Sequence, residues 1–116
     1  QSVPKRVSEV AWVSAGAMLV RRAAFEAVGG FDEHFFLYWE DIDLCKRLRA
    51  AGWQIVVAPQ AVAVHQRGHS LPDTVRKAKL YDKSADRYFR KHYATPIWLT
   101  QRSLRRVYRY FSPEAQ

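Results

Sequence analysis

Two adjacent carboxylates, Glu40 and Asp41, are the residues of this sequence best placed to do chemistry. Apolar residues return after them at close to helical spacing, which predicts a helix from about Glu40 to a stop at Gly52. A carboxylate at the exposed start of such a helix could act as a general base on a bound ligand. Alternatively, both acids only complement the helix dipole, which stabilises a helix by about 0.3–1 kcal/mol per acid.

Small residues stand at the centre of an apolar stretch earlier in the chain. The stretch from Glu9 to Val20 contains β-branched residues and is predicted as a buried strand, yet it includes Ser14 and Gly16. Small residues in a strand indicate either the close approach of a ligand or tight packing against a helix. Both explanations stay open, so Ser14 and Gly16 are candidate substrate-binding residues.

Three other residues could contribute to a site, and each has a structural alternative. Asp32 follows a pair of glycines and suits a turn or a helix cap. Trp39 could stack on a sugar or a base, although aromatic residues beside acids more often belong to a core. His65 ends a predicted strand, where it could face a site, but a lone histidine is more often a hydrogen-bonded structural residue.

The remaining elements are predicted from periodicity and from breaker residues. A short helix should end at Gly29-Gly30, and a long helix should open at Pro72-Asp73 and end before Pro96. The predicted elements are therefore a helix at 21–28, strands at 53–58 and 61–65, a helix at about 73–95, and a second C-terminal helix at about 97–111. In the last helix, apolar residues share one face and the arginines oppose it.

The composition is that of one small globular domain. The chain has 116 residues, of which 48% are hydrophobic, and a formal net charge of +8. It has no apolar run of about 18 residues, so no spanning helix is expected. No signal peptide is visible in the sequence. The single cysteine, Cys45, excludes an internal disulfide, fits a reducing compartment and is expected to be a small buried hydrophobe.

The positive charge is concentrated near the C-terminus. Residues 1–70 hold 8 basic and 7 acidic residues, whereas residues 71–116 hold 11 and 4. Three interpretations are open: a solvated surface, attachment to an anionic membrane surface, or nucleic-acid binding. Nucleic-acid binding ranks last, and is not expected, because the sequence has no zinc-ligand spacing, RNP motif or evident recognition helix.

Several motifs also occur in an order that is similar to a known family. The motifs are VSAGAMLVRR at 13–22, FEAVGGFDE at 25–33, FFLYWEDIDLCKRL at 35–48, AGW at 51–53, and His65. Together they resemble the C-terminal half of family 2 glycosyltransferases, and in particular the bacterial rhamnosyltransferase-like enzymes of polysaccharide assembly. The resemblance covers about residues 10–93.

The resemblance implies an α/β chain that forms part of a GT-A fold, with short strands, flanking helices and a C-terminal helical pair. It implies an inverting transfer of a sugar from a nucleotide-sugar to a hydroxyl of a glycan or lipid-linked acceptor, with Mg²⁺ or Mn²⁺. Asp41 would be the catalytic base, and Glu40 would orient or contact the acceptor. Asp32 and Glu33 would border the acceptor site, and His65 would help to hold the metal.

The chain departs from the family pattern because the nucleotide-binding half, with its Asp-x-Asp motif, is absent. Asp41-Ile-Asp43 has the right letters, but the predicted helix needs both acids, so a metal site there is not expected. Since the chain also lacks an initiator methionine, we expect a piece of a longer protein. Residues 1–93 would be the acceptor-side half of a catalytic domain, residues 94–116 would be a basic amphipathic tail, and the isolated chain would be inactive.

Expectations about class and assembly follow from the same features. The alternative to an enzyme fragment is a non-catalytic binding or membrane-surface module on a transferase-derived scaffold. A cytoplasmic location is also expected, either free or peripheral at the inner face of the membrane. Because a half-domain exposes a sheet edge and apolar faces, a homodimer is a further expectation.

Overall fold

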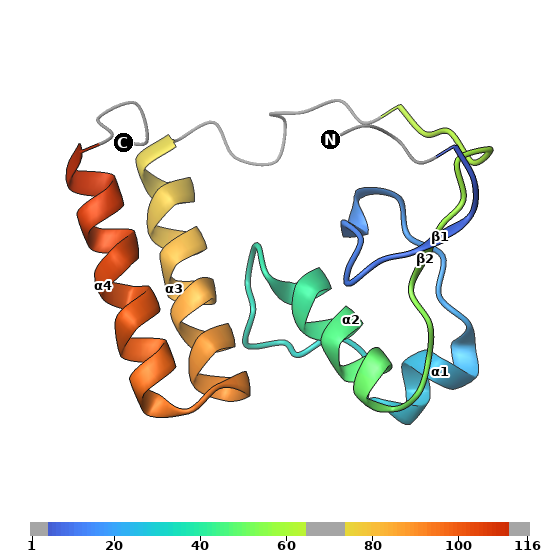
Figure 1. Cartoon of the computed structure of the whole chain (residues 1–116), viewed down its shortest axis with the longest axis horizontal. Helices are drawn as coiled ribbons and strands as arrows, with labels where there is room; N and C mark the ends of the chain where they lie inside the picture. Colours follow the sequence, from blue (N-terminus) through green and yellow to red (C-terminus); the bar gives the residue numbers. More distant parts are fainter. Residues whose placement is uncertain (1–4, 65–73, 112–116) are drawn as a thin grey trace. The chain divides into compact units, whose positions relative to one another are not determined.

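A computed structural model of the chain describes residues 5–64 and 74–111 (Figure 1). Its elements in chain order are β1 (Ser8–Glu9), the 3₁₀ turn η1 (Ala15–Ala17), α1 (Arg22–Ala27), α2 (Glu40–Ala50), β2 (Val56–Val57), α3 (Thr74–His92) and α4 (Thr95–Phe111). The described residues divide into two compact units, with residues 5–33 and 40–64 in the first and residues 34–39 and 74–111 in the second. This division follows packing, and the expected functional boundary at residue 93 stays a prediction.

The first unit packs α2 beside α1 and a two-stranded antiparallel sheet. Strand β1 pairs with β2 in the register Ser8 to Val57 and Glu9 to Val56. The apolar stripe predicted for α2 is confirmed, because Leu44, Cys45 and Leu48 lie in the core of this unit. That core also contains Ala24 of α1 and Ile55 next to β2.

Glycines end both helices of the first unit, as the sequence predicts. Gly52 has φ +86°, and the N–H groups of Gly52 and Trp53 return to the carbonyls of Arg49 and Leu48 at 3.0 Å each. Gly29 has φ +76° and ends α1 with the same pair of hydrogen bonds. Only a residue that tolerates a positive φ can close a helix in this way without strain.

The strand predictions are mostly wrong. The stretch 9–20 contains strand only at Glu9 and then forms η1, because Ser14 caps the turn and the N–H of Ala15 bonds to a side chain instead of a neighbouring strand. The strand predicted at 53–58 shrinks to β2. Residues 61–64 form no strand, and Val62 and Val64 are 85% and 92% exposed, so no packing holds them extended.

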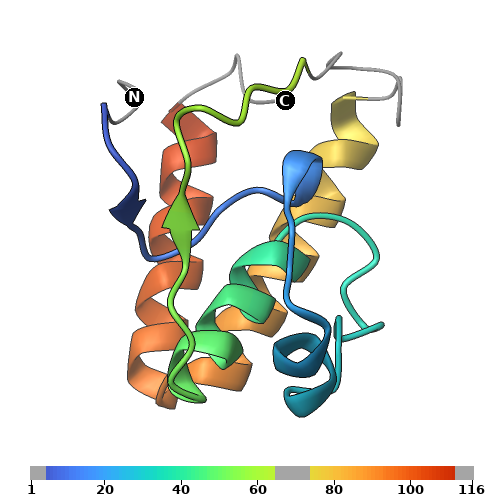
Figure 2. The ribbon, with the colours of Figure 1, turned by 90° about the vertical axis from the view of Figure 1, so that its right-hand side faces the viewer.

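The second unit is a helical hairpin. Figures 1 and 2 show α3 and α4 side by side and antiparallel, joined by a connection of two residues. Both helices were predicted, although α4 starts two residues early because proline is tolerated in a first helical turn. Residues 34–39 pack on α3, where Ser84 donates a hydrogen bond to the carbonyl of Leu37 at 2.8 Å.

Ion pairs join one face of α4 to α3. Asp86 pairs with Arg105, and also with Arg102 at 3.5 Å, and Asp82 pairs with Arg109. The arginine face of α4 therefore lies against α3, and the apolar face of α4 is exposed. None of the helices within residues 5–64 and 74–111 is long and apolar enough to cross a membrane.

Candidate active site

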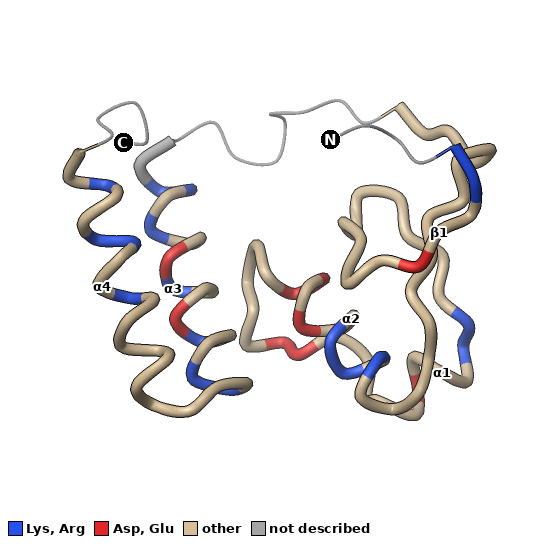
Figure 3. Tube along the Cα trace, in the orientation of Figure 1, with Lys and Arg blue, Asp and Glu red and all other residues tan. Residues whose placement is uncertain are grey.

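The start of α2 holds three acids, which appear together in Figure 3. The carboxylate of Asp41 accepts two backbone hydrogen bonds: Oδ1 from the N–H of Ile42 at 2.8 Å and Oδ2 from the N–H of Ala15 at 3.1 Å. These bonds fix the orientation of the carboxylate. Because two carboxylate oxygens offer about four lone pairs, Asp41 keeps capacity for a further donor such as a hydroxyl group. Its side chain is only partly buried, so such a donor can reach it.

The bond from Ala15 brings three of the predicted site residues into one place. Ala15 lies in η1 between Ser14 and Gly16, and the Oγ of Ser14 accepts the N–H of Gly16 at 3.4 Å. The turn thus presents exposed small residues beside Asp41, although the two segments are 26 positions apart in sequence. This contact could not be predicted from the sequence, because the donor is a backbone N–H, which every residue except proline carries.

Glu40 lies in a different environment from its neighbour. Burial raises the pKa of Glu40 above its ordinary value of 4.5, the negative charge of Asp41 raises it further, and a backbone hydrogen bond opposes the rise. The Oε2 atom of Glu40 is buried and has no hydrogen-bond partner in the described part of the chain. A carboxyl group of this kind can take up a proton more readily than a solvated one.

Asp43 has a structural role. It is fully buried, and its Oδ2 lies 2.8 Å from the Nε of Arg47. Arg47 also donates from Nη1 to the carbonyl of Val28 at 2.6 Å, so the pair ties α2 to the end of α1. The i, i+4 spacing of Asp43 and Arg47 is the signal in the sequence that indicates this pair.

The described residues do not fit a resident metal ion. Within residues 5–64 and 74–111, no group of three or more His, Cys, Asp or Glu side chains could hold one. Asp43 is committed to Arg47, so the pair Asp41 and Asp43 does not act as a substitute metal motif. His65, the predicted metal ligand, lies outside the described residues.

The loop before α2 is strained. Tyr38 and Trp39 have φ values of +66° and +70°, a region that costs non-glycine residues roughly 1–3 kcal/mol each. Packing on α3 holds Trp39 in place, since its ring centroid lies 5.0–5.6 Å from those of Tyr81, Tyr88 and Phe89. No glycine or asparagine at these positions signalled the conformation.

The remaining predicted site residues keep their roles as predictions. Asp32 is partly buried and Glu33 is exposed, and both lie between α1 and α2 in the chain. Trp39 belongs to the aromatic cluster of the second unit, and its Nε1 is buried without a hydrogen-bond partner in the described residues. Cys45 is confirmed as a buried residue, and its burial raises the pKa of its thiol.

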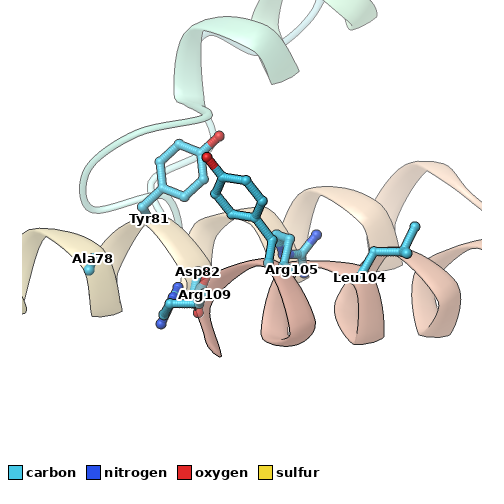
Figure 4. A pocket seen from close by; sticks show the side chains of 7 residues that line it. Ala78, Tyr81, Asp82, Leu104, Arg105 and Arg109 are labelled. Carbon is cyan, nitrogen blue, oxygen red and sulfur yellow. Dashed lines mark ion pairs between the residues drawn. The ribbon is translucent and has the colours of Figure 1, made fainter. Parts of the chain in front are cut away.

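A pocket of about 420 Å³ lies between α3 and α4 (Figure 4). Its walls are mostly apolar and include the ion pair of Asp82 and Arg109. None of the predicted site residues lines it. The full lining is Ala78, Tyr81, Asp82, Leu104, Arg105, Tyr108 and Arg109.

Comparison with known proteins gives consistent matches. The family described as glycosyltransferase like family 2 matches residues 2–90. N-acetylglucosaminyl-diphospho-decaprenol L-rhamnosyltransferase of Mycobacterium tuberculosis is 52% identical over 61 residues, which cover 53% of this chain and 20% of that protein. Rhamnosyltransferase WbbL of Escherichia coli K12 is 37% identical over 105 residues, which cover 90% of this chain and 38% of that protein.

A third relative carries a different name. The pre-mycofactocin glycosyltransferase of Mycobacterium tuberculosis is 37% identical over 78 residues, covering 67% of this chain and 16% of that protein. No solved structure matches the chain. In each of these comparisons, the matched segment spans well under half of the relative.

Proposed function

This chain belongs to the family 2 glycosyltransferases and is rhamnosyltransferase-like, and on that premise we propose that it is the acceptor-side part of an inverting enzyme with a GT-A fold. The donor would be a nucleotide-sugar, and the acceptor would be a hydroxyl of a glycan or of a lipid-linked saccharide. The relatives support this acceptor class, because one of them is named for transfer to a diphospho-decaprenol-linked sugar. Such transfer would serve the synthesis of cell-surface polysaccharide.

In this proposal Asp41 is the general base. It would accept the proton of the acceptor hydroxyl while that oxygen forms a bond to the anomeric carbon and the bond from that carbon to the leaving diphosphate breaks. The observation that carries the proposal is the pair of backbone hydrogen bonds to Asp41, which hold a partly exposed carboxylate in one orientation beside η1. A base fixed before the acceptor binds loses little entropy in the reaction.

Other residues have supporting roles. The exposed N-terminal part of η1, with Ser14 and Gly16, would form one wall of the acceptor site, and Glu40 would help to orient the acceptor. Asp32, Glu33 and Trp39 remain candidates for contacts with the substrate. Mg²⁺ or Mn²⁺ remains a prediction for the intact enzyme, and no step is assigned to it because the described residues do not fit a metal.

Replacement of the base tests the proposal. In the intact enzyme, Asp41→Asn should lower kcat by about 10²–10⁴-fold, the usual contribution of a general base, with little change in donor binding. Glu26→Gln is a matched control, because Glu26 is an exposed acid of α1 in the same unit, and it should leave kcat unchanged. A kcat for Asp41→Asn within a few-fold of the unmodified enzyme removes Asp41 from this role. The isolated chain is expected to give no turnover with or without the substitution.

A further inference from the structure

The outer face of α4 is unusually apolar for a surface helix. No residue of α4 is buried, and seven of its large apolar residues are between 48% and 82% exposed. Six of them are Ile97, Leu99, Leu104, Val107, Tyr110 and Phe111. Single exposed apolar residues need no explanation, but a continuous face of them along one helix usually marks an interaction surface.

The arrangement of charges keeps this face outward. Arg105 and Arg109 are turned toward α3 by their ion pairs with Asp86 and Asp82. Rotating α4 to bury its apolar side would break these pairs and leave two carboxylates of α3 facing apolar side chains. The hairpin is therefore built to present the apolar face of α4.

The other helix of the hairpin, α3, carries exposed cations. Lys79, Lys83 and Arg90 are exposed and follow each other by four and seven residues, so they form one stripe along α3. Lys83 comes one residue after Asp82, which pairs with Arg109 of α4, and the guanidinium of Arg90 itself lies 5.3 Å from the ring centroid of Trp98 in α4. One residue is a turn of about 100° around the helix, so the stripe lies beside the α3–α4 interface. Figure 3 shows Lys and Arg along both helices.

We propose that the α3–α4 hairpin docks on an anionic membrane surface. The apolar face of α4 would enter the boundary between headgroups and acyl chains, and the stripe of Lys79, Lys83 and Arg90 would contact the anionic headgroups. An interfacial helix combines these two features: apolar and aromatic residues on one side and cations at its flanks.

Charge complementarity favours this occupant over a second copy of the chain. Two copies meeting through α4 would bring two cationic stripes together in a chain that already carries a net charge of +8. An anionic lipid surface instead attracts the cationic stripe and also the chain as a whole, because the net charge of the chain is positive. The inference goes beyond the proposed function, because docking requires neither Asp41 nor a sugar donor.

The full 116-residue chain can be tested by flotation with lipid vesicles. It should bind phosphatidylcholine vesicles that contain about 30 mol% phosphatidylglycerol at least about 10-fold more tightly than vesicles of phosphatidylcholine alone. High salt should weaken this binding, because screening reduces the attraction between the lysines and the headgroups. No binding, or equal binding to both vesicles, overturns the proposal.

Matched variants distinguish the effect of the stripe on vesicle binding from the effect of positive charge elsewhere in the chain. Lys79→Glu with Lys83→Glu should reduce binding to the anionic vesicles by at least about 25-fold, since each cation contributes about fivefold near such a surface. Lys5→Glu with Arg6→Glu makes the same change of charge at two exposed residues of the first unit and should have a much smaller effect. Equal losses in the two double variants overturn the proposal.

A second pair of variants tests the apolar face. Val107→Ser with Phe111→Ser should reduce binding by about 10-fold, whereas Leu19→Ser with Val62→Ser, at residues of the first unit that are at least 85% exposed, should not. Sedimentation of the free chain tests the rival occupant. A dimer that the Val107 and Phe111 substitutions dissociate, with vesicle binding unchanged, overturns the proposal in favour of a second copy.

Discussion

The two units of the molecule use their acidic residues differently. In the first unit, the side chain of Asp43 is fully buried and bonded to Arg47, which also reaches a backbone carbonyl of α1. In the second unit, Asp82 pairs with Arg109, and both side chains are about one-third exposed. A buried acid of this kind holds the packing of one unit together, whereas the more exposed pairs of the hairpin determine which face of α4 is presented to its surroundings.

Replacing one acid in each unit should give the largest difference in the free energy of unfolding between two variants. Asp43→Asn leaves Arg47 without its buried partner and should lower the free energy of unfolding by about 3 kcal/mol. Asp82→Asn removes a more exposed pair and should lower it by less than about 1 kcal/mol. Urea denaturation of the two variants measures both effects. Similar losses would mean that the two pairs do not differ in the way their burial indicates.

A second contrast lies between two glycines of the first unit. Gly30 has φ +69°, and a Cβ placed there would lie 3.1 Å from the Phe25 ring, whereas at Gly52, with φ +86°, a Cβ would meet nothing within 4 Å. Gly52→Ala should therefore cost about 1 kcal/mol, from backbone strain alone. Gly30→Ala should cost about 2 kcal/mol, because the contact with Phe25 adds to the strain. Thermal unfolding of the two variants tests this order.

The smallest expected effect concerns pH. Because the pKa of Glu40 is raised in the folded chain, the charged carboxylate costs stability above that folded pKa. The cost is relieved as pH falls through the folded pKa and is gone below the ordinary value of 4.5. Glu40→Gln should thus raise Tm by less than about 5 °C at pH 7.5 and leave it unchanged near pH 4. Glu33→Gln, at an exposed site, is the control. A gain in Tm for Glu40→Gln that is equal at both pH values would contradict the burial of this carboxyl group.

The sequence predicted the helices well because their signals are local. Gly29 and Gly52 mark the ends of α1 and α2, and Leu44, Cys45 and Leu48 recur at the spacing of a buried helical face. These signals depend on neighbours within a few residues, so they survive whatever the rest of the chain does.

The missed features depend on residues distant in the sequence. The bond between Ala15 and Asp41 involves a backbone donor 26 positions away, and it is part of the reason that the predicted strand at 9–20 became a turn. The outward face of α4 depends on Asp82 and Asp86 of another helix. For the same reason, the candidate site could be predicted as a set of residue types but not as an arrangement.

In the proposed function, two acids of one helix have separate roles: Asp41 takes part in the chemistry, and Asp43 stabilises the fold through Arg47. In the intact enzyme, kcat and Tm of Asp41→Asn and Asp43→Asn can be measured side by side, with kcat expressed per folded molecule. We expect Asp41→Asn to keep its Tm and to lose about 10²–10⁴-fold in kcat, and Asp43→Asn to have a lower Tm but to retain most of its kcat. Near-normal turnover by Asp41→Asn, or a loss of activity that follows Tm in both variants, would contradict these separate roles.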